Sequence, residues 1–73
     1  MTHQEAFDLV KQELDSATRK YGKFQSAHEE YAIILEELDE LFDEIKNREC
    51  HKQLELEVKQ VAAMAIRFLI DCC

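Results

Sequence analysis

A chain of 73 residues forms one domain at most, and a domain of this size buries too little surface to be more than marginally stable alone. Its formal net charge of −7 repels a nucleic-acid duplex, so duplex binding is not expected, and no apolar run approaches the roughly 18 residues that a membrane span requires. With no Pro, one Gly and no secretory signal pattern, the sequence predicts a soluble, cytoplasmic and almost entirely helical protein.

The first predicted helix begins at Thr2 and ends near Lys20. Thr2, with Glu5 three residues later, forms the capping-box pattern of a helix start. Apolar residues then recur at helical spacing, at Phe7, Val10, Leu14 and Ala17. The Tyr21-Gly22 pair breaks this period, so we expect the helix to stop there.

The second predicted helix begins at Ser26, where Glu29 completes another capping box. Its apolar face consists of Tyr31, Ile34, Leu35, Leu38, Leu41, Phe42 and Ile45. Polar residues at 47–50 interrupt the pattern and predict a turn. Because no Gly or Pro marks that turn, one continuous helix from Ser26 to the C-terminus remains an alternative.

The third predicted helix has an apolar face made of Leu54, Val58, Val61, Ala62, Ala65, Phe68, Leu69 and Cys72. Further apolar residues lie beside the main stripes of the second and third helices, and this width predicts that a partner subunit covers them. We therefore expect an all-α fold, with residues 1–73 as a single domain. In it, the three-helix chain forms part of an oligomeric antiparallel four-helix-type bundle.

Two polar stretches become neighbours if the second and third helices fold back antiparallel about a turn near Glu49. Glu37 then lies level with Gln60, and Glu40 lies level with Glu57. At about 100° per residue, the four side chains also fall on facing flanks of the two helices. Carboxylates gathered beside an apolar seam repel one another unless a cation lies between them. Three carboxylates and one amide oxygen suit Mg²⁺, or Mn²⁺ as a second choice. The alternative is a solvated acidic face, which is common on helices.

The segments around these residues resemble the MazG-like, all-α nucleoside triphosphate pyrophosphohydrolase superfamily. The family pattern is Glu-Glu-x-x-Glu, a spacer and then Glu-x-x-Asp, and Glu36, Glu37 and Glu40 match its first half. Glu57 matches the second half, whereas Gln60 stands where the family has Asp. The similar segments are residues 26–46 and 58–68, the latter including a Val-Ala-Ala-Met-Ala-Ile tail.

The resemblance implies a Mg²⁺-dependent hydrolase, a homo-dimer or homo-tetramer, that cuts a (deoxy)nucleoside triphosphate into the monophosphate and pyrophosphate. It implies that Glu37, Glu40 and Glu57 ligate the metal, with Gln60 as a fourth ligand through its amide oxygen. Glu36 is the candidate catalytic base. Because Gln60 brings no charge, a catalytically degenerate nucleotide-binding, metal-binding or regulatory module is the second hypothesis. A plain helical protein-interaction domain is the third.

Four further residues are weaker candidates for binding the nucleotide. Arg48 and Arg67 lie on the acidic flank within reach of phosphates, with simple counter-charges as the alternative. Phe24 and His28, near the start of the second helix, are candidates for stacking on the base. For His28 the alternative is a solvated position in the first helical turn.

Overall fold

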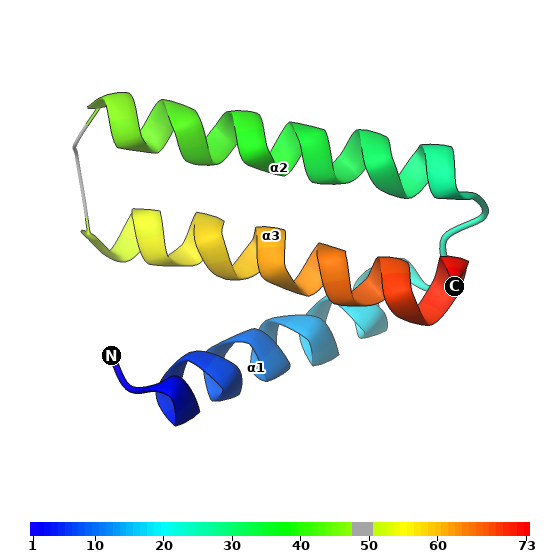
Figure 1. Ribbon diagram of the computed structural model, residues 1–73, viewed down its shortest axis with the longest axis horizontal. Coiled ribbons are helices and arrows are strands. Elements are labelled where there is room, and N and C mark those ends of the chain that lie inside the picture. Colours follow the sequence, from blue (N-terminus) through cyan, green and yellow to red (C-terminus); the bar gives the residue numbers. More distant parts are fainter. Residues whose placement is uncertain (48–50) are drawn as a thin grey trace.

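The computed structural model describes residues 1–47 and 51–73, which form three α-helices: α1 His3–Tyr21, α2 Ala27–Asn47 and α3 His51–Cys72 (Figure 1). Strands are absent from this described part of the chain, so the predicted all-α fold is confirmed. α2 and α3 lie side by side and run antiparallel, which excludes the continuous helix (Figure 1). The turn predicted between them lies outside the described residues. None of the three helices, over the residues described, is long and apolar enough to cross a membrane.

The helix ends follow the capping signals in the sequence. Thr2 Oγ1 accepts the Glu5 backbone N–H, and the Glu5 carboxylate accepts the Thr2 N–H, so the first capping box is confirmed. At the start of α2 the Ser26 hydroxyl accepts the Glu29 N–H, as in a capping box. The Glu29 carboxylate accepts the N–H of Gln25 in place of the Ser26 N–H, so only half of the predicted second capping box forms. α1 stops at Gly22, whose φ of +63° is a conformation that side chains with a Cβ rarely adopt.

α3 is the central helix. α1 and α2 both pack against α3, on different sides, and within the described residues they do not pack against each other. The small core lies along α3, where Ala63 and Met64 are buried together with Ala17 of α1. The small side chains of Ala17 and Ala63 allow α1 and α3 to approach closely.

The apolar face predicted for the third helix is only partly buried within one chain. Val58 and Leu69 of that face are 48% and 65% exposed, whereas Glu57 and Arg67 are buried. The reason is that α3 is enclosed from two directions, so its buried residues do not coincide with its most apolar stripe. Polar residues instead face α2.

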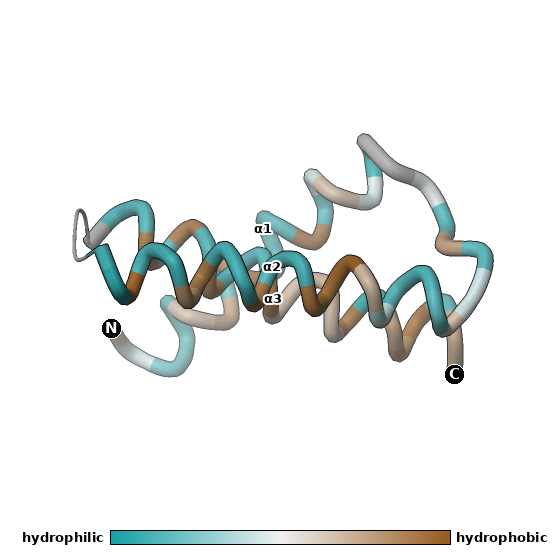
Figure 2. Tube along the Cα trace, turned by 90° about the horizontal axis from the view of Figure 1, so that it is seen from above, coloured by the Kyte–Doolittle hydropathy of each residue, from teal (hydrophilic) through white to brown (hydrophobic). Residues whose placement is uncertain are grey.

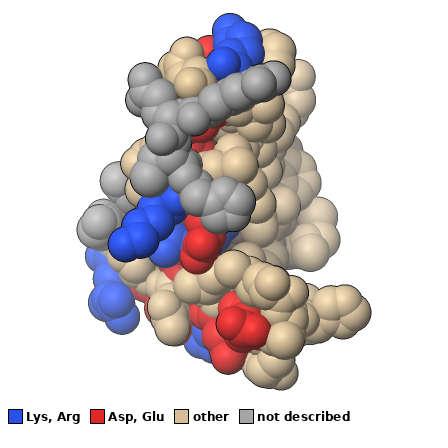
Figure 3. All heavy atoms as spheres, turned by 90° about the vertical axis from the view of Figure 1, so that its left-hand side faces the viewer, with Lys and Arg blue, Asp and Glu red and all other residues tan. Residues whose placement is uncertain are grey.

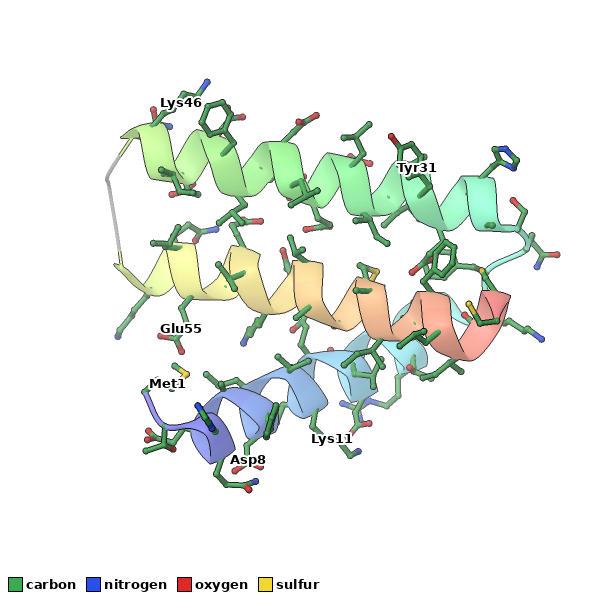
Figure 4. All side chains as sticks on the ribbon, in the orientation of Figure 1. Met1, Asp8, Lys11, Tyr31, Lys46 and Glu55 are labelled. Atoms are coloured by element: carbon green, nitrogen blue, oxygen red, sulfur yellow. The ribbon has the colours of Figure 1, made fainter. Side chains whose placement is uncertain are left out.

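The apolar face of α2 is largely uncovered by the chain itself. Five large residues, at 62, 45, 44, 58 and 51% exposure, form what we call the α2 stripe: Tyr31, Leu35, Leu38, Phe42 and Ile45. They recur at the spacing of a coiled-coil seam, and Figure 2 shows apolar residues following one edge of this helix. The side chain of Tyr31 points away from α3 (Figure 4).

Candidate metal centre

Polar side chains of α2 and α3 face each other at three levels, that is, at three heights along the interface between these antiparallel helices. On α2, Glu30, Glu37 and Glu44 recur at intervals of seven residues, so they lie along one side of the helix. In the antiparallel register they lie level with Arg67, Gln60 and Gln53 of α3, respectively. Glu30 is fully buried, and Glu44 has a buried carboxylate oxygen that forms no hydrogen bond with the described residues. An acidic line therefore runs along the interface, and Arg67 is the counter-charge at one end of it.

Three carboxylates meet at the middle level, and we call Glu37, Glu40 and Glu57 the acidic cluster. One oxygen from each lies within 4.8 Å of the other two. Glu57 is buried, Glu37 is half-buried and Glu40 is exposed, so the cluster opens from the helix interface toward solvent. The antiparallel register predicted from the sequence brought these residues together because i,i+3 spacing keeps Glu37 and Glu40 on one side of α2.

The cluster carries more negative charge than its surroundings compensate. Burial, followed by the charges of Glu40, Glu57 and Glu36, raises the pKa of Glu37 from its ordinary 4.5 to about 7. Desolvation and the charge of Glu57 also raise the pKa of Glu40. A divalent cation among these oxygens would reverse both effects, because it favours the ionised carboxylates.

Two glutamines complete the surroundings of the acidic cluster. Gln53 Nε2 donates to Glu57 Oε1 over 2.9 Å. The amide group of Gln60 lies 3.0 Å from Glu37 Oε2 and 3.2 Å from Glu57 Oε2. With its nitrogen toward the carboxylates, Gln60 donates a hydrogen bond to each; with its oxygen toward them, it adds a fourth oxygen to the group. The donor set then consists of oxygen atoms alone, which fits Mg²⁺ or Mn²⁺.

A cavity of about 330 Å³ adjoins the acidic cluster. It lies over α3, between α1 and α2, where those two helices do not pack against each other. Residues from all three helices and from the loop between α1 and α2 line it, among them Glu13, Ala17, Phe24, Glu29, Glu37 and Gln60. Because Glu37 and Gln60 belong to both the cluster and the cavity wall, a ligand in this cavity reaches the carboxylates.

Three of the four weaker candidates, and the candidate base, lie in different surroundings. Phe24 lines the cavity, as a residue that stacks on a base would. His28 is exposed in the first turn of α2 and does not line the cavity. Arg48 lies outside the described residues. Glu36, the candidate base, is exposed on α2 and close enough to Glu37 and Glu40 for its charge to raise the pKa of both.

Arg67 holds the loop between α1 and α2 in place. Its side chain is 3% exposed, and its guanidinium donates to the carbonyl of Gly22 and lies 4.1 Å from the centre of the Phe24 ring. Asp71 Oδ2 accepts the Phe24 N–H over 3.1 Å and lies 3.7 Å from Arg67 Nη2. Seven residues, or about 10 Å of helix, separate Arg67 from Gln60. In this arrangement Arg67 anchors Phe24 and lies two turns away from the acidic cluster.

Sequence reasoning missed the buried acids beside this arginine. Burial raises the pKa of Glu30, while the charge of Arg67 opposes that rise. The signal was present in the repeat of Glu30, Glu37 and Glu44 at seven-residue spacing. The repeat does not by itself indicate burial, because glutamates on surface helices usually point toward solvent.

Acidic side chains also reach the surface elsewhere. Seen from the end where α2 finishes and α3 begins, acidic atoms appear in separate groups rather than in one patch (Figure 3). Within the part of the chain that the structure describes, Glu37, Glu40 and Glu57 are the acids whose oxygens converge closely enough to hold a metal ion.

Comparisons with known protein families, curated proteins and solved structures give no match for this chain.

Proposed function

We propose that this chain is a Mg²⁺-dependent nucleoside triphosphate pyrophosphohydrolase of the MazG-like kind, which releases a nucleoside monophosphate and pyrophosphate. The observation that carries the proposal is the convergence of three carboxylates beside a cavity that two of the surrounding residues, Glu37 and Gln60, also line. A volume of about 330 Å³ lies within the range of ordinary small-ligand sites. The resemblance in residues 26–46 and 58–68 supports the same function.

The residues divide into separate tasks. Glu37, Glu40 and Glu57 would hold the cation, with Gln60 as the uncharged fourth neighbour. When bound, Mg²⁺ would neutralise negative charge on the phosphate oxygens. Glu36, which is exposed beside the cluster, would accept a proton from an attacking water. The half-buried position of Phe24 on the cavity wall suits contact with the nucleoside.

A second function of a different kind is supported by Gln60. Its amide nitrogen can donate to Glu37 and Glu57 at once, which satisfies both carboxylates without a cation. A chain that holds its acidic cluster together in this way has less need of the metal for folding. Such a chain suits a nucleotide-binding or regulatory module that does not hydrolyse the nucleotide.

The proposal includes a second copy of the chain. The α2 stripe consists of large apolar residues that are 44–62% exposed in one chain. An apolar surface of this kind along a whole helix marks an interaction site, and packing two such helices together would produce a four-helix-type assembly. A homo-dimer is the smallest assembly that covers the stripe, and a homo-tetramer is the next.

Metal-dependent melting together with pyrophosphate release tests the function. Mg²⁺ should raise the melting temperature of the parent protein, because a ligand that binds only the folded state stabilises it. Glu57→Gln should lose this rise, whereas Asp43→Asn, which changes an exposed acid paired with Lys46, should retain it. Pyrophosphate release by the parent supports the enzyme. Metal-dependent stabilisation without release supports the binding module, and no response to metal in any variant contradicts both.

A further inference from the structure

We infer that the cavity selects guanine among the nucleobases, through the carboxylate of Glu13. The inference rests on the proposed function, because it takes the cavity to hold the nucleoside while the phosphates lie at the acidic cluster.

The cavity has the length that this placement requires. It extends along α2 from Glu37 to Glu29, which are eight residues or about 12 Å of helix apart. Glu37 marks the end at the acidic cluster. Phe24 and Lys23, in the loop before α2, line the cavity together with Glu29. A nucleotide with its phosphates at Glu37 would therefore extend its base toward the loop.

Three carboxylates line the cavity, and they are not equivalent. Glu37 belongs to the acidic cluster. Glu29 accepts the backbone N–H of Gln25 and so takes part in capping α2. Glu13, on α1, is half-buried and forms no hydrogen bond or ion pair with the described residues. Glu13 is the carboxylate that a ligand can engage without disturbing another contact.

The chemistry of a carboxylate decides which base suits it. An ionised carboxylate only accepts hydrogen bonds, and its two oxygens accept two parallel donors. Guanine presents two adjacent donors, N1–H and the N2 amino group, and its O6 accepts a hydrogen bond from a group such as the Lys23 ammonium. Adenine and cytosine place an acceptor nitrogen next to their amino group. Thymine and uracil place a carbonyl on each side of their single N–H. Both of these patterns turn an acceptor toward the carboxylate.

Nucleoside monophosphates test this selection apart from hydrolysis. We expect dGMP, in the presence of Mg²⁺, to bind about tenfold or more tightly than dAMP, dCMP or dTMP, because hydrogen bonds to charged groups are worth that much. The methyl signals of Ala17 and Met64, both on the cavity wall, report binding by NMR. dIMP, which lacks the N2 amino group, should bind more weakly than dGMP to the parent protein.

Glu13→Gln provides the decisive comparison. In this variant the difference between dGMP and dIMP should largely disappear, because the carboxylate that accepts from the amino group is gone. The matched control is Glu55→Gln, the same change at an exposed residue on the side of α3 nearer Met1 (Figure 4), and it should leave the difference intact. An unchanged melting temperature shows that each variant is folded.

The outcomes separate the inference from the proposed function. Equal binding of all four monophosphates, or a dGMP preference that survives Glu13→Gln, overturns the selection by Glu13. If pyrophosphate is still released from triphosphates in those cases, the proposed function stands. If the Ala17 and Met64 signals respond to no monophosphate although triphosphates are cleaved, the cavity does not hold the nucleoside and the inference falls. If no nucleotide binds or is cleaved, both fall.

Discussion

Replacing Gln60 by glutamate is the sharpest perturbation of the acidic cluster. The substitution keeps the length of the side chain but places a carboxylate where the amide now lies, 3.0 Å from Glu37 Oε2 and 3.2 Å from Glu57 Oε2. Two unit charges at 3 Å repel by about 5 kcal/mol at an effective dielectric constant of 20. Proton uptake limits this cost, because Glu37 already has a pKa raised to about 7 and a fourth acid would favour its protonated form.

We therefore expect Gln60→Glu to lose about 2 kcal/mol of unfolding free energy in chelator at pH 7.5. In a domain of this size that corresponds to a fall of about 10 °C in melting temperature. The same substitution should strengthen the binding of Mg²⁺, because the added carboxylate attracts the cation. The metal dissociation constant should fall about tenfold, equivalent to about 1.4 kcal/mol.

Melting in chelator and calorimetric titration with Mg²⁺ measure the two effects. Gln60→Met is the control, since it removes the amide without adding charge. Its free energy of unfolding should fall by about 1 kcal/mol, which is what an ordinary hydrogen bond contributes, and its affinity for Mg²⁺ should not increase. A Gln60→Glu protein that melts like the parent in chelator and binds Mg²⁺ no more tightly would refute the position of Gln60 among the carboxylates.

The raised pKa of Glu37, the exposed α2 stripe and the buried Arg67 can each be tested by one substitution. In chelator, the pKa of Glu37 is about 7 in the folded state and 4.5 when unperturbed, so the folded protein binds the extra proton between these values and its stability should fall as pH rises through them. Glu37→Gln should flatten this slope in melts between pH 4.5 and 7.5, and an unchanged slope would assign it to other groups. If the protein forms the proposed homo-oligomer, Phe42→Glu in the α2 stripe should give a folded monomer by sedimentation, whereas a parent protein that is already monomeric at micromolar concentration would contradict that proposal. Arg67→Met should lower the free energy of unfolding by about 3–5 kcal/mol, because it leaves Glu30 and Asp71 without their counter-charge. Adding Glu30→Leu should recover part of that loss, and denaturant unfolding measures both effects.

The helix ends and the register of α2 against α3 could be predicted because their causes are local. Thr2 and Ser26 are capping residues, and Gly22 tolerates the positive φ that ends α1. Once α2 and α3 are antiparallel, the position of the turn decides which residues lie level. This reasoning placed Gln60 beside Glu37, and the structure has the two side chains in contact.

The inward faces could not be predicted from apolar periodicity. That period identifies the most hydrophobic side of a helix, but α2 turns this side outward and presents Glu30, Glu37 and Glu44 toward α3. Glu30 is buried although neither of its carboxylate oxygens forms a hydrogen bond with the described residues, and the charge of Arg67 on α3 offsets part of the cost of that burial. Such compensation depends on tertiary contacts, which single-sequence patterns do not encode.

The cavity was also beyond sequence reasoning. It exists because α1 and α2 pack on different sides of α3 without packing on each other, and this depends on the angle at which α1 crosses α3 (Figure 1). Phe24 is predicted as a base contact from its residue type and its place near the start of the second helix. Its position on the cavity wall follows from contacts with Arg67 and Asp71 that are distant in the sequence.

Phosphorus NMR of the protein with dGTP and Mg²⁺ tests the central claim most directly, because it identifies which phosphate bond is cut. The proposed function predicts that dGMP and pyrophosphate appear together at equal rates, and that Glu40→Gln abolishes both signals. Release of inorganic phosphate with dGDP, or an undiminished rate in Glu40→Gln, would contradict pyrophosphohydrolysis at the acidic cluster.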